Sequence, residues 1–321
     1  QVLHISKAPK KIQLGLKLTK GLGAGMKPEV GRDSAVESYE EIKATLKGAD
    51  IIFIAAGLGG GTGTGAAAII AKAAKEIGAL TVSVVTKPFT WEGKKRAGLA
   101  NLGLEELKKV SDSIIIVPND RLLEIIDENV GMKDAFKIID NILYQAVNGM
   151  SEVILNPGNS DINTDFADVK TIMQHKGMAL MGIGRAKGEN AAQRALEDAV
   201  DSPLLDKVSL NGAKGILIHF NIHPQVSLFA INDVMGTIND RMDSNAEIIF
   251  GTTSDSTLEK DEVKITIVAT GFESRNDELE ETNELSDENV AQNTAALDDS
   301  NENYYDTPPF MRDYRVQYQL N

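Results

Sequence analysis

The chain has 321 residues and a formal net charge of −14, with 42% hydrophobic residues and no cysteine. This length suffices for two domains with sizeable cores, and the absence of cysteine excludes disulfides and thiolate metal sites. The charge is acidic and no basic stripe offsets it, so the composition disfavours nucleic-acid binding. No apolar run is long enough for a transmembrane helix, so direct membrane insertion is not expected.

Residues 51–118 alternate between strand and helix patterns, which is typical of a parallel sheet covered by helices. Strands are predicted at 51–56, 80–86 and 114–117, and helices at 66–77 and 94–110. A longer helix is predicted over 133–154, where apolar residues recur at helical spacing before Pro157 stops the helix. The expected fold is a Rossmann-like parallel α/β sheet followed by a long central helix.

A second, smaller α/β domain is expected behind the long helix. Its helices are predicted at 166–176, 189–200 and 226–242, and its strands at 178–184, 215–220, 246–253 and 263–271. The predicted division therefore places a first domain in residues 1–155 and a C-terminal α/β domain in residues 156–273.

The acidic residues concentrate in the C-terminal tail. Residues 274–321 hold twelve Asp or Glu and three Arg, a net charge of −9. Residues 274–303 have too few apolar side chains to offset chain entropy, so a disordered acidic linker is predicted. Apolar residues return around two prolines in 304–321, which indicates a short peptide that orders on a partner.

A glycine-rich segment, Gly59–Gly65, lies between the strand at 51–56 and the helix at 66–77. Its five glycines allow the backbone to approach a ligand closely and to adopt positive φ. The following helix directs free N–H groups and the positive end of its dipole toward this segment. Strand, glycine segment and helix together predict a site for a phosphate group, and hence for a nucleotide.

Two common phosphate-binding patterns fit the segment poorly. No lysine follows any of its glycines, so the P-loop pattern fails. Gly61, Gly63 and Ala66 meet the dinucleotide pattern formally, but a glycine-dense run satisfies many spacings by chance. That pattern also requires an acidic residue after the next strand, which instead ends in Lys87-Pro88. Alternating glycine and threonine fit a polyphosphate held by amides and hydroxyls.

The glycine segment offers no carboxylate to orient a water molecule for hydrolysis. Asp165 and Asp168 lie three residues apart at a predicted helix start and project from the same first turn. Helix capping explains the same pair and is worth roughly 1 kcal/mol. The residues alone favour capping over catalysis.

No other constellation in the sequence indicates catalysis. The four histidines are scattered without a convincing set of partners, so no metal site is predicted from them; they are His4, His175, His219 and His223. No Gly-x-Ser-x-Gly or Cys/His arrangement indicates a covalent nucleophile. Trp91 beside Glu92 is compatible with covering a ribose or with ordinary packing.

Five segments together resemble the tubulin/FtsZ GTPase family, in its FtsZ branch. They are the run 59–65, the glycine loop 21–31, and the segments 88–96, 118–123 and 134–140. The resemblance covers nearly all of residues 1–273. It implies that GTP or GDP is the ligand, with Mg²⁺ accompanying the triphosphate.

The resemblance also assigns roles in nucleotide binding. The residues implied to contact the phosphates are Gly23, Ala24, Gly25, Gly60, Gly61, Thr62, Gly63 and Thr64. Glu92 and Arg96 are implied to contact the ribose, Phe136 to stack on guanine, and Asp140 to read the edge of the base.

The segment from Asn163 to Asp168 resembles the family's catalytic loop, which reverses the preference for capping. Asn163, Asp165 and Asp168 are implied to enter the nucleotide site of the next subunit. Such a contact is heterologous, so it propagates head to tail into a filament. The implied function is a cytoplasmic GTPase that scaffolds the bacterial division ring, and residues 306–312 resemble the family's peptide for membrane-anchoring division proteins.

Two departures from the family pattern keep alternatives open. The chain starts at Gln1, without the family's first strand and first glycine loop, and segment 157–163 is about two residues longer than usual. A nucleotide-dependent scaffold without catalysis therefore remains an alternative. A dinucleotide-dependent oxidoreductase is disfavoured because its acidic ribose partner is missing.

Overall fold

The computed structural model describes residues 3–123, 130–155, 162, 165–175, 177–202, 205, 210 and 212–272. Residues 1–273 form one compact unit, to which all structural statements below refer. Asn163 and the predicted linker and peptide of the tail lie outside the described residues.

The helices follow the strands in near alternation. The helices are α1 (Pro28–Glu37), α2 (Tyr39–Leu46), α3 (Thr62–Glu76), α4 (Lys94–Lys108), α5 (Asn119–Leu122), α6 (Met132–Leu155), α7 (Phe166–Met173), α8 (Ala191–Val200) and α9 (Leu228–Asn239). Short 3₁₀ helices occupy Leu3–Ile5 and Thr90–Glu92. The strands are β1 (Ile51–Gly57), β2 (Leu80–Lys87), β3 (Ser113–Pro118), β4 (Met178–Lys187), β5 (Gly215–Ile222), β6 (Glu247–Ser254) and β7 (Glu262–Phe272).

The strands form a seven-stranded sheet in the order β1-β2-β3-β4-β7-β5-β6. Strands β1 to β4 pair in parallel, and β3 meets β4 over only two residue pairs, Ile114 with Met178 and Ile115 with Ala179. Strand β7 runs antiparallel to both of its neighbours, β4 and β5. The expected parallel α/β architecture is confirmed, and the strands of both predicted domains join in one sheet.

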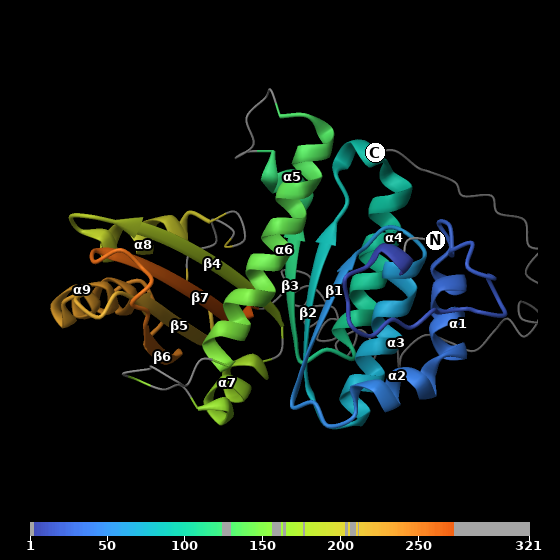
Figure 1. The fold of residues 1–321 in the computed structure, drawn as a ribbon, viewed down its shortest axis with the longest axis horizontal. Coiled ribbons are helices and arrows are strands. Elements are labelled where there is room, and N and C mark those ends of the chain that lie inside the picture. Colours follow the sequence, from blue (N-terminus) through green and yellow to red (C-terminus); the bar gives the residue numbers. More distant parts are fainter. Residues whose placement is uncertain are drawn as a thin grey trace, which may run out of the picture. The chain divides into compact units, whose positions relative to one another are not determined.

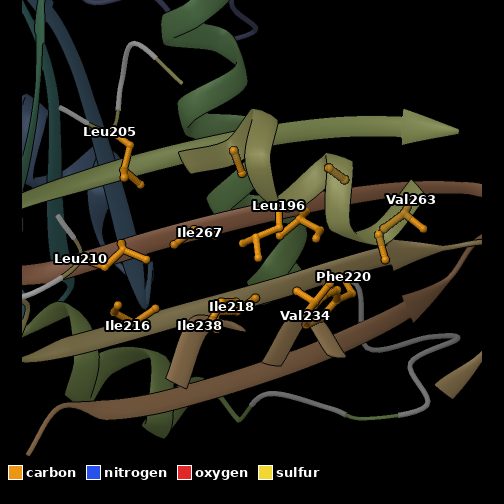
Figure 2. Packing of buried hydrophobic residues seen from close by; sticks show 14 of the residues in the cluster. Leu196, Leu205, Leu210, Ile216, Ile218, Phe220, Val234, Ile238, Val263 and Ile267 are labelled. Atoms are coloured by element: carbon orange, nitrogen blue, oxygen red, sulfur yellow. The ribbon is translucent and has the colours of Figure 1, made fainter. Parts of the chain in front are cut away.

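Buried side chains lie on both faces of the sheet because helices cover both. Seven of the eight residues of β2 are buried, which explains its nearly continuous run of apolar and small polar residues. In the C-terminal half, Leu196 of α8 and Val234 of α9 pack over Ile218 of β5 (Figure 2). One buried cluster belongs to each half, and a third cluster, which includes Val82 and Leu217, joins the two halves.

Helix α6 packs on one face of the sheet, across the region where its two halves join (Figure 1). Its 24 residues make it about 36 Å long. Its apolar stripe, which includes Ile139, Ile142 and Met150, belongs to the core around β2 and α7. The predicted long central helix is confirmed, and its length keeps residues near Met132 far from residues near Leu155.

The largest difference from the sequence prediction concerns the start of α3. This helix begins at Thr62 and not near Ala66, so most of the glycine segment is helical. Glycine allows this because Gly63 and Gly65 pack directly against the backbones of Gly57 and Pro28. Helices α1 and α2 were not predicted, although Pro28 is a common first residue of a helix.

Candidate nucleotide-binding site

The candidate site lies at the carboxyl ends of β1, β2 and β3, which meet at one edge of the sheet. These strands end at Gly57, Lys87 and Pro118. Ligands of parallel α/β sheets bind outside this edge, in the loops that follow the strands. The segments assigned to the nucleotide therefore start from the same edge.

The two glycine segments are in direct contact. A Cβ at Gly61 would overlap the carbonyl oxygen of Gly25 and come within 2.8 Å of the Cβ of Ala24. A Cβ at Gly31 would likewise overlap the carbonyl of Gly61. This contact is consistent with the sequence prediction of two phosphate loops, because the loops 21–25 and 59–65 lie close enough for one anion to contact both.

The glycines of the run 59–65 serve packing more than backbone freedom. Only Gly59 has positive φ, at 99°, among the residues of this run. A Cβ at Gly60 would meet nothing within 4 Å, so Gly60 alone in the run faces open space. In the loop 21–25, Gly23 and Gly25 have φ of 85° and 58°, with open space beside them.

The first turn of α3 offers amide groups for an anion. Its N-cap is Gly61, and no side chain caps the helix. The N–H groups of a first helical turn have no partner within the helix, and the dipole favours negative charge there. Thr62 is exposed, whereas Thr64 is buried and its hydroxyl accepts a hydrogen bond from the Gly59 amide at 2.9 Å. Thr64 therefore shapes the turn.

Glu92 organises the segment expected to contact the ribose. Its carboxylate accepts a hydrogen bond from the Phe89 amide at 2.9 Å and pairs with the Arg96 guanidinium at 2.6 Å. The side chain of Glu92 is 12% exposed and that of Arg96 is 44% exposed. The two residues thus form one unit at the start of α4.

Three aromatic rings form a contiguous group at the same edge. Phe89 is buried and stacks on Trp91 with ring centroids 5.3 Å apart. The edge of Phe89 meets Phe136 of α6 at 6.0 Å, and Phe136 remains 40% exposed. Asp140 lies one helical turn after Phe136 and is exposed. The structure therefore brings the expected base-binding and ribose-binding segments together.

Sequence reasoning assigned no role to Asp120. Its carboxylate accepts hydrogen bonds from the Thr90 amide at 3.0 Å and the Thr90 hydroxyl at 2.5 Å. The available signal was its position, directly after a parallel strand. Trp91 was left open between ribose contact and packing; its ring stacks on Phe89 and remains 59% exposed, which is compatible with both.

The two aspartates proposed for catalysis lie elsewhere. Asp165 is the N-cap of α7, where its side chain accepts a hydrogen bond from the Ala167 amide at 3.2 Å; the capping prediction is confirmed for this residue. Both aspartates are exposed. The carboxyl end of α7 lies where β5 begins, because the Thr270 hydroxyl donates a hydrogen bond to the Ile172 carbonyl at 2.7 Å and Thr270 pairs with Gly215. The starts of β3 and β4 pair with each other, so α7 lies at the sheet edge opposite the candidate site (Figure 1).

The described residues contain no group of three His, Cys, Asp or Glu that could hold a metal ion. His219 is buried on β5, and its Nε2 lies 3.0 Å from the Thr253 hydroxyl. Burial lowers the pKa of His219 to about 4, so the ring is neutral at pH 7. His175 lies 3.3 Å from Glu247 at a partly exposed position.

Within the described residues, no helix combines the length and hydropathy that a membrane crossing requires.

The fold and site define a protein with a tubulin-type GTPase domain followed by a second α/β region. The family described as tubulin/FtsZ family, GTPase domain, matches residues 1–127, and the FtsZ family, C-terminal domain, matches residues 177–273.

Solved structures agree with these matches. A structure of M. jannaschii FtsZ, an empty dimer, is 47% identical with a TM-score of 0.77, over 84% of this chain and 77% of that chain. A variant of the same protein is 46% identical with a TM-score of 0.78, over 85% and 81%. The chain belongs to the FtsZ family.

More distant structures share the fold alone. CetZ1 from Haloferax volcanii, a GDP-bound monomer, is 19% identical with a TM-score of 0.68, over 87% of this chain and 83% of that chain. CetZ2 from the same organism, a GTPγS-bound protofilament, is 20% identical with a TM-score of 0.70, over 90% and 86%.

Proposed function

We propose that the chain is a cytoskeletal GTPase that binds GTP at the edge formed by β1–β3 and hydrolyses it only after head-to-tail assembly. The observation that carries this proposal is the separation of two half-sites. The phosphate loops lie at the carboxyl ends of the parallel strands, while Asp165 and Asp168 lie at the start of α7, which packs near the opposite edge of the sheet (Figure 1). A single chain therefore does not complete the site.

Nucleotide binding is supported by the clustering of the assigned residues. The contact between Gly25 and Gly61 and the uncapped start of α3 suit a polyphosphate. The Glu92–Arg96 unit and the exposed ring of Phe136 are proposed to contact the nucleoside. Asp140 is proposed to read the guanine edge, because a carboxylate accepts the hydrogen bonds that guanine donates.

Hydrolysis in an assembled form is supported by the exposure of both aspartates. We propose that Asp165 and Asp168, with Asn163, enter the nucleotide site of the next chain and orient the attacking water. The contact is heterologous, so it repeats along a filament. Solved relatives include an FtsZ dimer and a CetZ2 protofilament bound to GTPγS, which agree with such assembly.

Magnesium is proposed to accompany the triphosphate. Because the described residues hold no three-residue metal cluster, the ion would be held mainly by phosphate oxygens and water. It would neutralise charge that develops on the phosphates. Among the chain's own groups, the amides at the start of α3 share that task.

The wider role proposed for the filament is a scaffold of the bacterial division ring in the cytoplasm. Family membership supports this role. Attachment to membrane-anchoring division proteins through residues 306–312 is proposed from the sequence alone, since that peptide lies outside the described residues.

The test is the rate of GTP hydrolysis per chain as a function of protein concentration, recorded together with light scattering. The expected rate is near zero at low concentration and rises above a critical concentration, together with scattering. A rate per chain that is independent of concentration would contradict a shared site. Polymer that releases no phosphate would instead support the non-catalytic scaffold, and turnover of NADH would support an oxidoreductase.

A further inference from the structure

Asp120 connects two neighbouring loops at the candidate nucleotide site. It follows the end of β3, and Thr90 follows the end of the adjacent strand β2. The Asp120 carboxylate accepts hydrogen bonds from the Thr90 amide at 3.0 Å and the Thr90 hydroxyl at 2.5 Å, one on each oxygen. Both oxygens thus hold a single residue of the neighbouring turn.

That residue lies at the centre of the turn assigned to the nucleoside. On one side, Phe89 stacks on Trp91 at 5.3 Å and meets Phe136 edge-on at 6.0 Å. On the other side, Glu92 closes the turn through the Phe89 amide and pairs with Arg96. The hydrogen bond from Phe89 to Glu92 and the Glu92–Arg96 ion pair lie within the turn and at its border with α4, so they fix the shape of the turn. The hydrogen bonds from Thr90 to Asp120 fix the position of the turn relative to β3.

We propose that Asp120 is a positioning residue for the nucleotide: through Thr90, it holds the turn 89–92 where the exposed ring of Trp91 and the Glu92–Arg96 unit receive the nucleoside. The role rests on the proposed nucleotide site. A charged acceptor forms stronger hydrogen bonds than a neutral one, which suits a turn that is otherwise exposed at Thr90 and Trp91. Both oxygens of Asp120 already accept hydrogen bonds from Thr90, so the proposed role acts through the turn.

A matched control lies at the opposite end of the same strand. Asp112, just before β3, accepts a hydrogen bond from the Thr81 amide at 2.8 Å, near the start of β2. It therefore joins β3 to β2 by the same chemistry as Asp120, but away from the candidate site. Asp120→Ala and Asp112→Ala each remove a carboxylate that joins β3 to β2, with two hydrogen bonds lost in the first variant and one in the second.

The experiment measures GDP affinity at a protein concentration too low for assembly, with the fluorescence of Trp91, the sole tryptophan, as the signal. We expect Asp120→Ala to weaken GDP binding about tenfold, the effect of losing roughly one hydrogen bond. Thr90→Val, which keeps the amide, should weaken it less. Thr90→Ser, which keeps both donors, should bind GDP as the wild type does. Asp112→Ala should lower the melting temperature without changing GDP affinity.

Two further measurements distinguish a displaced turn 89–92 from a general loss of folded structure. Without nucleotide, Asp120→Ala should make Trp91 more accessible to a soluble quencher, while Asp112→Ala should not. Combining Asp120→Ala with Thr90→Val should weaken GDP binding no more than Asp120→Ala alone, because both remove one connection.

Equal GDP affinities of the wild type and Asp120→Ala would overturn the role of Asp120 and leave the proposed function intact. A parallel loss of affinity in Asp112→Ala and Asp120→Ala would also overturn it, because the effect would then be general destabilisation. Failure of the wild type to bind GDP or GTP would overturn the nucleotide site and this role with it.

Discussion

Gly61 is the residue at which the two phosphate loops touch. Its neighbours, the carbonyl of Gly25 and the Cβ of Ala24, leave no room for a side chain. Three other glycines pack in the same way, so the glycine content of this region reflects close backbone packing around α3. They are Gly31, Gly63 and Gly65. The proposed phosphate site therefore depends on close packing between backbone segments as well as on free amide groups.

The substitution Gly61→Ala should separate the two loops. We expect it to lower the free energy of unfolding by about 1–3 kcal/mol and to weaken GDP binding, because the added methyl group has no space. Urea denaturation and a GDP titration measure the two effects. The control is Gly98→Ala in α4, where nothing lies within 4 Å and a gain of about 0.5–1 kcal/mol is expected. Equal stability of Gly61→Ala and the wild type would contradict the packing argument.

His219 should make stability depend on pH. Its pKa is lowered to about 4 by burial, from 6.5. Between these values the unfolded chain binds a proton that the folded chain does not. The free energy of unfolding therefore falls as pH drops from 6.5 to 4, by up to roughly 3 kcal/mol.

The measurement compares urea unfolding of the wild type and His219→Gln at several pH values between 7 and 4. Asp255 and Glu262, whose pKa values are lowered by hydrogen bonds to Thr257 and Arg185 respectively, also lose their stabilising effect as pH falls. Their contribution is common to both proteins and cancels in the difference. A difference that stays constant over this range would contradict the assignment to His219.

At the scale of elements, α7 combines two roles at its first turn. Asp165 caps the helix, and the same residue is proposed to act on a neighbour's nucleotide. The substitution Asp165→Asn separates these roles, because asparagine caps a helix as well as aspartate does but carries no charge.

We expect Asp165→Asn to retain the wild-type stability and to lower the rate of GTP hydrolysis about 10²-fold. Asp165→Ala should lose the same activity and, in addition, about 1 kcal/mol of stability. Thermal unfolding and phosphate release provide the two readings. Full activity of Asp165→Asn would restrict this residue to capping.

Most elements could be predicted because their patterns are local. The apolar run of β2 and the helical periodicity of α6 both appear in the structure within a few residues of their expected bounds. The start of α3 could not be predicted, because it depends on close tertiary packing of Gly65 against the backbone of Pro28, far away in sequence. The role of Asp120 also escaped prediction, since its partner Thr90 is thirty residues away in sequence.

At the scale of the whole molecule, the sheet and α6 keep the two proposed half-sites apart. The nucleotide edge lies at the carboxyl ends of β1–β3, and α7 lies near the opposite edge, where β4 and β5 begin (Figure 1). This separation follows from topology and could be inferred from the sequence only through the family resemblance. It is also the reason why catalysis is proposed to require a second chain.

The most direct test mixes two variants that are each inactive for a different reason. Asp168→Ala retains the nucleotide site but lacks a catalytic carboxylate, while Arg96→Ala combined with Phe136→Ala retains α7 but lacks nucleoside contacts. In the mixture, an intact α7 can meet an intact nucleotide site at some junctions. We predict that mixing restores a clear fraction of the wild-type rate of GTP hydrolysis. A mixture that assembles and yet stays as inactive as its components would contradict a catalytic site shared between chains.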